Sequence, residues 1–390
     1  MEPLRIVMVA ACPFPYPRGT PIRVLRLSEA LAARGHDVHV VTYHLGEPTP
    51  APSLTLHRTV NLRTYRKTSA GPSLQKLVVL DPLLAVCLRR VLRDHPADVV
   101  HAHHYEGLLV AAALRRRIAA ALVFDVHTLL EHELSSYLPF GPRRWVDTAA
   151  AWIDRRAPAL ADHVVAVTPA IQDSLVRHGA APAERVSVVM NGVSLAHFGE
   201  RPHAGGVAHA GVRTLIYAGG LASYQRIDLL LGALRALLQR RQDVRLNIVS
   251  HEPLEGVHHL ARRYGVDAYT TLSRVRFGEV PALLARSEVA LNPRTSCIGV
   301  PMKLLNYMAA SKPVVSFSGA AYPLEHGSTG WVVENENVEA FAQAICLMLD
   351  DRALARQLGE NARRAVATRF TWEAAAAETE AIYGRLLTRR

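Results

Sequence analysis

Residues 299–317 read GVPMKLLNYMAASKPVVSF and place a turn, a short amphipathic helix and a buried strand in direct succession. Pro301 suits the first helical position because its fixed φ and missing N–H cost nothing there, and Gly299 lets the backbone approach a ligand closely. The unpaired amides of the first turn and the positive end of the helix dipole favour a phosphate. The stretch therefore predicts an anion-binding helix start in an α/β protein. The residues expected to line it are Gly299, Val300, Pro301, Met302, Lys303 and Asn306.

The same stretch resembles the donor-binding signature of GT-B glycosyltransferases of the family 4-like group, K-L-L-E-Y-M-A-x-G-K-P-V-V after a glycine-rich loop. Residues 303–315 of this chain read KLLNYMAASKPVV, so Asn306 replaces the glutamate that grips the donor ribose in the family. Ile298 stands where the family carries a second acidic residue. Asparagine can still accept and donate hydrogen bonds, so ribose contact remains feasible without the charge. The resemblance implies a UDP-sugar or GDP-sugar donor. A helix start after a Gly-Pro turn also occurs in α/β proteins that bind no anion there.

Composition fits a soluble enzyme of two domains. The chain has 390 residues, 49% hydrophobic and 20% charged, which is enough for two cores. Its 4 cysteines are scattered without C-x-x-C pairing, which argues against a disulfide framework or a zinc ribbon and suits a reducing cytosol. The apolar stretch at 5–12 runs into prolines and lacks the pattern of a signal peptide. We expect a cytoplasmic protein.

Strands and helices alternate along the chain, which predicts parallel sheets covered on both faces. The pattern opens with a strand over 5–12, a helix over 21–34 and a strand over 38–43. A tract at 201–211, rich in Gly, Ala and His, reads as a linker between two domains. The strands expected after it are 214–217, 245–249, 274–277, 289–292, 313–317 and 330–333.

The resemblance implies the GT-B fold, in which two Rossmann-like, doubly wound parallel-sheet domains face a cleft. We expect an acceptor-binding domain over residues 1–200 and a nucleotide-sugar-binding domain over residues 201–370. The resemblance also implies that the final helix, within 371–390, crosses back to pack on the first domain. Periodicity alone cannot show that crossing.

Two further stretches resemble the family in the expected order. Residues 188–198, VVMNGVSLAHF, resemble the V-I-x-N-G-V-D-x-x-x-F stretch at the end of the first domain. Gly19 and Thr20 stand where many members carry two glycines, in a loop that would face the donor phosphates or the transferred sugar. The alternative is that the proline-rich residues 13–21 only join a strand to a helix.

The family commonly shows G-R-L followed by K-G after the strand at 214–218, and this chain departs from that pattern. Gly219, Gly220 and Leu221 come first, so the arginine position is glycine, and the lysine position is Gln225. Arg226 is the neighbouring residue that could supply the lost positive charge to the leaving diphosphate, although it could also be an exposed structural arginine. Removing a preorganised donor from such a site costs about 2.7–4 kcal/mol of barrier.

His127 is the candidate catalytic residue of the first domain. It follows an apolar strand, at the carboxyl end where open α/β sheets hold their ligands. The resemblance implies that it contacts the transferred sugar, although a lone histidine at a strand end is often structural. Glu131 and Glu133 lie where a helix or lid could present a carboxylate to an acceptor.

Three histidines within four positions, His101, His103 and His104, raise the question of a metal. Alternation along a strand puts His101 and His103 on one side and His104 on the other, so the three cannot easily share one ion. No D-x-D pair stands at a strand end. We expect no metal site, and the GT-B resemblance implies none.

A net charge of +11 indicates an anionic partner. Arg63, Arg66, Lys67 and Lys76 cluster near Tyr65, and such a basic face could rest on anionic lipid headgroups, which would suit a lipid-linked acceptor. Nucleic acid is not expected, because no aromatic-basic module or helix-turn-helix signature is present.

The sequence thus favours a glycosyltransferase that moves a sugar from a nucleotide-sugar donor to an acceptor hydroxyl, retaining and metal-independent like the relatives it resembles, in the synthesis of a cell-surface glycan or glycolipid. One alternative is a catalytically impaired GT-B-fold binding or scaffold protein that supports a partner transferase, because Gly220, Gln225 and Asn306 depart from the family pattern. A sugar epimerase of the same fold is a third reading.

Overall fold

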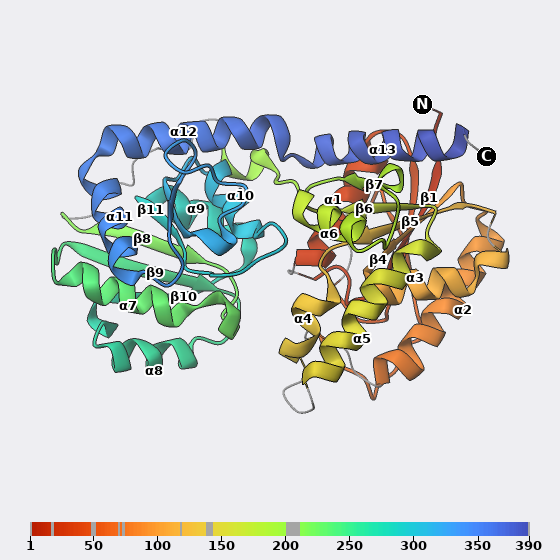
Figure 1. Ribbon diagram of the computed structural model, residues 1–390, viewed down its shortest axis with the longest axis horizontal. Helices are drawn as coiled ribbons and strands as arrows, with labels where there is room; N and C mark the ends of the chain where they lie inside the picture. The colour runs from red at the N-terminus through yellow and green to blue at the C-terminus, as the bar shows by residue number, and fades with distance from the viewer. Residues whose placement is uncertain are drawn as a thin grey trace. The chain divides into compact units, whose positions relative to one another are not determined.

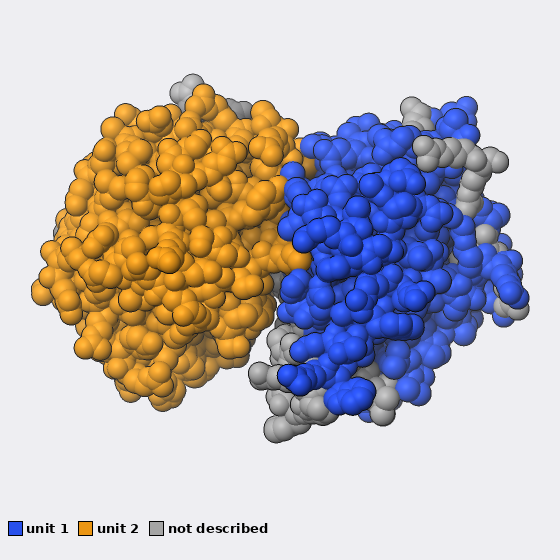
Figure 2. Space-filling model, viewed as in Figure 1, with its two compact units in different colours: residues 1–191, 372–390 blue, residues 192–371 orange. Residues whose placement is uncertain are grey.

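The computed structural model describes residues 2–16, 19–47, 52–68, 71, 75–117, 119–137, 143–199 and 211–388. The chain divides into two compact units, shown in Figure 2: unit 1 is Met1–Asn191 with Trp372–Arg390, and unit 2 is Gly192–Thr371. Residues 192–199 therefore group with unit 2 and not with the first domain, whose end was predicted at residue 200. The predicted linker lies outside the described residues except at Gly211.

The described strands of unit 1 form one seven-stranded parallel sheet in the order β3-β2-β1-β4-β5-β6-β7 (Figure 1). Their bounds are β1 Arg5–Ala10, β2 Asp37–Thr42, β3 Thr55–Arg58, β4 Val99–His103, β5 Ala121–Val126, β6 His163–Ala166 and β7 Val186–Val188. Every residue of β4 and β5 is buried, because helices cover both faces of a parallel sheet.

The helices of unit 1 include the C-terminal helix of the chain. Their bounds are α1 Gly19–Ala33, α2 Asp81–Asp94, α3 His104–Ala113, α4 Leu130–Tyr137, α5 Arg143–Arg156, α6 Pro169–Arg177 and α13 Trp372–Thr388. A π-helix, η1 Lys76–Leu80, precedes α2, and short 3₁₀ helices are η2 Arg115–Arg117, η3 Ala157–Leu160 and η4 Ala183–Arg185. Helix α13 lies beside α1, and Glu380 forms an ion pair with Arg34. The predicted return of the final helix to the first domain is confirmed.

The described strands of unit 2 form a six-stranded parallel sheet in the order β10-β9-β8-β11-β12-β13. Their bounds are β8 Arg213–Ala218, β9 Val244–Ser250, β10 Thr270–Arg274, β11 Val289–Asn292, β12 Val314–Phe317 and β13 Trp331–Val333. The strand predicted at 274–277 is wrong in position, since β10 ends at Arg274. This edge strand, TTLSR, is partly exposed and carries a weak apolar signal.

Helices cover the second sheet around a core formed mainly by β8, β9, β11, β12, α7 and α11, in which Phe317 and Phe341 pack with ring centroids 4.6 Å apart. The helices are α7 Ile227–Leu238, α8 Glu255–Tyr264, α9 Val280–Arg286, α10 Met302–Ala309, α11 Val338–Asp350 and α12 Arg352–Arg369. Short turns are η5 Leu195–Phe198, η6 Ser223–Gln225, η7 Asp267–Tyr269, η8 Phe277–Glu279 and η9 Ser318–Ala320. The two Rossmann-like parallel-sheet units confirm the predicted fold class. Among the described residues, none of these helices is both long and apolar enough to cross a bilayer.

Candidate active site

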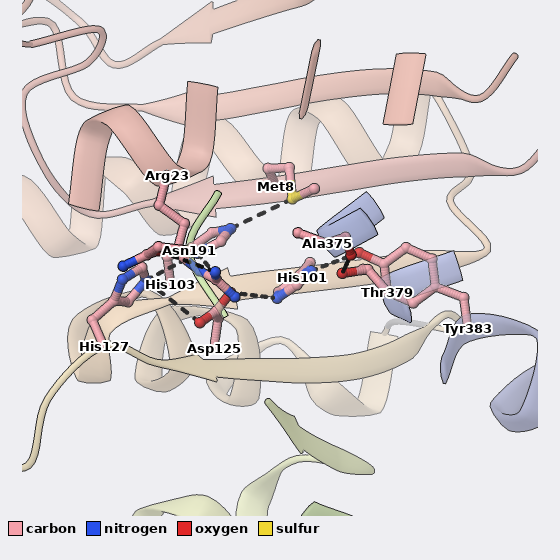
Figure 3. A network of polar contacts seen from close by, with 10 residues as sticks. All are labelled: Met8, Arg23, His101, His103, Asp125, His127, Asn191, Ala375, Thr379 and Tyr383. Carbon is pink, nitrogen blue, oxygen red and sulfur yellow. Dashed lines mark hydrogen bonds and ion pairs between the residues drawn. The ribbon is translucent and has the colours of Figure 1, made fainter. Parts of the chain in front are cut away.

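The centre of the polar network in unit 1 is a fully buried ion pair between Arg23 of α1 and Asp125 of β5 (Figure 3). The guanidinium donates from Nε to Oδ2 of Asp125 at 3.0 Å and from Nη1 to Oδ1 of Asn191 at 3.1 Å. Burial would raise the pKa of Asp125, but Arg23 and the neighbouring histidines outweigh it and hold that pKa well below its usual value. Removing either partner would leave the other charge buried without a counter-ion, which lowers the free energy of unfolding by about 3–5 kcal/mol.

Strand register brings two of the three adjacent histidines to the same carboxylate. His103 of β4 pairs directly with Asp125 of β5, and His101 lies two residues earlier on the same face, as the alternation predicted. The imidazole of His101 approaches Oδ2 of Asp125 through Nε2 at 3.4 Å, and that of His103 through Nδ1 at 3.6 Å. The three side chains could offer ligands to a metal ion. The guanidinium of Arg23, 2.9 Å from the same oxygen, already supplies the positive charge there.

His127 lies just beyond the carboxyl end of β5, and its side chain is only 9% exposed. Its Nε2 is 3.2 Å from Nδ1 of His103 and 3.8 Å from Oδ1 of Asp125. Its ring stacks on His104, which takes a left-handed φ of 62° at the start of α3. Burial holds the pKa of His127 well below 6.5, although Asp125 opposes the shift, so the imidazole is neutral at pH 7.

The C-terminal helix enters this network through Tyr383. Its phenol oxygen lies 2.6 Å from Nδ1 of His101, and Figure 3 shows His101 between Asp125 and Tyr383. The two rings meet edge to face with centroids 5.9 Å apart. No local sequence signal marks this tyrosine as a partner of the histidines, so the sequence prediction missed it together with Arg23.

In unit 2, Lys303 is the central side chain. It lies on the first turn of α10, is buried, and its Nζ donates to Oε1 of Gln225 at 2.6 Å. The ammonium also sits 4.5 Å from the centroid of the Tyr217 ring. Burial, with a smaller contribution from nearby Arg294, holds the pKa of Lys303 well below 10.5. Gln225 occupies the position where the family carries a lysine, and its side chain contacts Lys303 of α10.

The two glycines after β8, Gly219 and Gly220, lie close to the side chain of Tyr217. A Cβ on Gly219 would lie 3.1 Å from the hydroxyl of Tyr217 and 3.5 Å from Cδ of Lys303. The carbonyl of Gly220 accepts a hydrogen bond from that hydroxyl at 2.5 Å. Glu252, which the sequence analysis did not single out, accepts from the amide of Leu221 at 2.9 Å and braces the turn.

Helix α10 starts one residue later than the sequence predicted, because Pro301 has an extended ψ of 109° and not a helical one. Pro301 is the N-cap residue and Met302 the first helical residue, while Gly299 and Val300 precede the helix. The Asn306 side chain is half-buried and makes no hydrogen bond to any described residue, which leaves its amide available to a ligand.

Arg226 does not join Lys303 and Gln225. It takes a left-handed φ of 55° before α7, and its guanidinium donates to Asp228 at 3.0 Å and to Glu336 at 2.5 Å. These hydrogen bonds, that to Asp228 first, raise the pKa of Arg226 above its usual value. In unit 1, Gly19 and Thr20 begin α1, one turn before Arg23, and open space surrounds the position of a Cβ on Gly19.

Two family models match the chain, one in each unit for most of its length. The family model described as Glycosyltransferase Family 4 matches residues 17–197, and that described as Glycosyl transferases group 1 matches residues 212–351. The chain belongs to the family 4-like GT-B glycosyltransferases. It is an enzyme of that class, as the sequence predicted.

Two curated relatives resemble this glycosyltransferase along most of its length. It is 28% identical to D-inositol 3-phosphate glycosyltransferase of Kribbella flavida, over 94% of this chain and 90% of that protein. It is also 28% identical to MMP alpha-(1->4)-mannosyltransferase of Mycolicibacterium hassiacum, over 95% of each chain. The solved structure of sucrose-phosphate synthase from Thermosynechococcus elongatus superposes with a TM-score of 0.82 at 19% identity, covering 99% of this chain and 100% of that one.

Proposed function

We propose that this glycosyltransferase moves a sugar from a UDP-sugar or GDP-sugar to an acceptor hydroxyl, with retention of configuration and without a metal ion. The observation that carries the proposal is the buried ammonium of Lys303. Its Nζ donates to Oε1 of Gln225 at 2.6 Å and to the hydroxyl of Tyr217 at 3.4 Å, and it forms no ion pair with a carboxylate of the described residues. Burial disfavours the charged form of this amino group, and a bound anion would stabilise its ammonium form.

A donor diphosphate satisfies this requirement. Lys303 lies in the first turn of α10, so its charge adds to the amides and the dipole at the start of that helix. Diphosphate binding would also return the pKa of Lys303 toward its usual value, since an adjacent negative charge favours the ammonium. We propose that Lys303 and the start of α10 hold the departing diphosphate, while Asn306 contacts the ribose. A side chain at Gly219 would crowd the hydroxyl of Tyr217 and Cδ of Lys303, so glycine at this position preserves the arrangement of those two groups.

Unit 1 supplies the remaining groups in this proposal. We propose that His127 contacts the transferred sugar and that the segment beginning at Gly19 and Thr20 faces the donor. The two relatives carry different names, D-inositol 3-phosphate glycosyltransferase and MMP alpha-(1->4)-mannosyltransferase, so the acceptor is proposed only as a glycan, polyol or lipid-linked hydroxyl. Metal independence rests on Arg23, because a cation bound by His101 and Asp125 would face its guanidinium 2.9 Å from the same carboxylate oxygen.

A surface of unit 1 supports contact with an anionic membrane at the cytoplasmic face. The side chains of Leu77, Val78 and Val86 are 60%, 61% and 59% exposed on η1 and α2. Arg89 and Arg90 are exposed on the same helix. Apolar side chains beside arginines favour the interface of a bilayer with anionic headgroups. Co-sedimentation with phosphatidylglycerol vesicles should be lost in Leu77→Ser/Val78→Ser, and binding that survives this change would contradict the surface.

The donor proposal is tested with a panel of UDP-sugars and GDP-sugars, measured by thermal stabilisation and by slow hydrolysis with and without EDTA. We expect one donor to raise the unfolding temperature and to be hydrolysed in EDTA, and the released sugar to keep its anomeric configuration in proton NMR. Hydrolysis that stops in EDTA would refute metal independence. If no nucleotide sugar in the panel stabilises the protein or is hydrolysed, the alternative of a catalytically impaired scaffold protein is supported.

A further inference from the structure

The sulfur of Met8 on β1 lies 3.5 Å from Nε2 of His103, in a fully buried part of unit 1. A thioether sulfur accepts hydrogen bonds and cannot donate one. On Nδ1 of His103 a proton would face Oδ2 of Asp125 at 3.6 Å, which is beyond hydrogen-bond distance. We therefore place the proton of a neutral His103 on Nε2, where it points at the sulfur. Its Nδ1 is then a bare acceptor. Burial, joined by the charge on nearby His101, holds the pKa of His103 well below 6.5, which is consistent with this neutral form.

The unprotonated Nδ1 of His103 needs a hydrogen-bond donor, and the neighbouring ring of His127 can supply one. Nδ1 of His103 is 3.2 Å from Nε2 of His127, and two bare nitrogens at that distance would repel each other. His127 Nε2 therefore carries the proton. The same proton faces Oδ1 of Asp125 at 3.8 Å, a buried carboxylate oxygen that has no hydrogen-bond partner among the described residues. Both neighbours thus favour the same tautomer.

From this chain of contacts we infer that His127 meets the substrate as a neutral imidazole with a bare Nδ1, and that Met8 and His103 are positioning residues that set this tautomer. The inference rests on the proposed function, in which His127 contacts the transferred sugar. A bare nitrogen accepts a hydrogen bond, so the ligand group facing it is a sugar hydroxyl acting as donor. An anionic oxygen of the substrate would be repelled from that nitrogen.

The rest of the network holds the two neighbours in place. Arg23 fixes the carboxylate of Asp125 from α1, and His101 contacts the same oxygen from β4 while Tyr383 fixes the far side of its ring. Ring orientation at His127 is also restricted by stacking on His104, with centroids 5.1 Å apart. Histidine tautomers are generally set by the hydrogen bond that the second ring nitrogen makes.

The direct test is nitrogen-15 NMR of the full chain labelled at histidine, at pH 7 and without any donor, with the His127 signals assigned from their absence in His127→Asn. We expect the wild-type protein to show a protonated Nε2 and a bare Nδ1 at His127. Met8→Leu conserves volume and removes the acceptor, so His103 should populate both tautomers and His127 should follow. A wild-type His127 protonated at Nδ1, or tautomers unchanged in a folded Met8→Leu, would overturn the inference.

A second comparison uses turnover and does not depend on Met8. An asparagine at 127 places its amide near the position of Nδ1, whereas a glutamine places its amide near that of Nε2. We expect His127→Asn to retain about tenfold more donor turnover than His127→Gln, the value of one hydrogen bond. The reverse order would overturn the inference. If the wild-type protein turns over no donor, the proposed function fails, and the NMR measurement still decides the tautomer.

Discussion

The hydroxyl of Tyr383 lies 2.6 Å from Nδ1 of His101, although 282 positions separate the two residues in the chain. This contact joins the last helix to the buried strand β4, and through His101 it reaches Asp125. The C-terminal helix therefore completes the polar network around His127 in addition to covering the surface of unit 1.

Replacing Tyr383 by phenylalanine should lower the free energy of unfolding by about 1–3 kcal/mol, because Nδ1 of the buried His101 would lose its partner. Urea unfolding followed by circular dichroism measures the change. Tyr224→Phe is the matched control, since that side chain is 52% exposed and contacts Arg294 through its ring. We expect the control to stay within about 0.5 kcal/mol of wild type. Equal midpoints for the two variants would show that the contact contributes nothing.

Lys303→Met should reduce turnover of the donor by about 10²- to 10³-fold, because it removes a preorganised positive charge from the proposed diphosphate site. Lys312→Met is the control: Lys312 is also buried in unit 2, but its ammonium donates to the carbonyls of Ala285 and Ser287. The control should lose stability while its Kd for the donor stays near that of wild type. Comparable Kd changes in the two variants, measured by calorimetry, would argue against a phosphate role for Lys303.

Arg226→Ala should reduce turnover less than Lys303→Met, because Asp228 and Glu336 already hold the guanidinium. The ion pairs are partly exposed, so unfolding free energy should change by less than about 1 kcal/mol. Steady-state kinetics on the donor that the panel of UDP-sugars and GDP-sugars selects gives the ranking. If both variants lose turnover equally, the arginine must release its carboxylates and reach the leaving group, as the sequence suggested.

The stability of the protein should fall as the pH drops below about 6.5. The pKa values of His103, His104 and His127 are all lowered by burial, that of His104 to about 4. Below pH 6.5 these histidines take up protons in the unfolded chain but not in the folded one. The stability present above pH 6.5 is therefore lost as the pH falls toward the pKa values of the folded state. His104 alone accounts for at most about 3 kcal/mol of this loss.

His104→Asn provides the comparison for this pH dependence. Asparagine tolerates the left-handed φ of 62° at that position and does not titrate. Urea midpoints between pH 7 and 4 should fall less steeply in the variant than in the wild type. Parallel slopes would mean that His104 titrates normally in the folded protein.

The sequence could predict the features that depend on local order along the chain. Alternating strands and helices predicted two parallel-sheet units, and the turn at Gly299 with Pro301 predicted the start of α10. Strand alternation also placed His101 and His103 on one face of β4. These predictions succeeded because φ preferences, helix starts and the two-residue period of a strand are properties of neighbouring residues.

By itself, then, the sequence determined the fold class, the family and the helix start, which are encoded over short spans. Only the tertiary structure decided which distant groups pair: Arg23 with Asp125, Lys303 with Gln225, and Tyr383 with His101. The physical reason is that a buried polar group must find its partner in space, and packing selects that partner from any part of the chain.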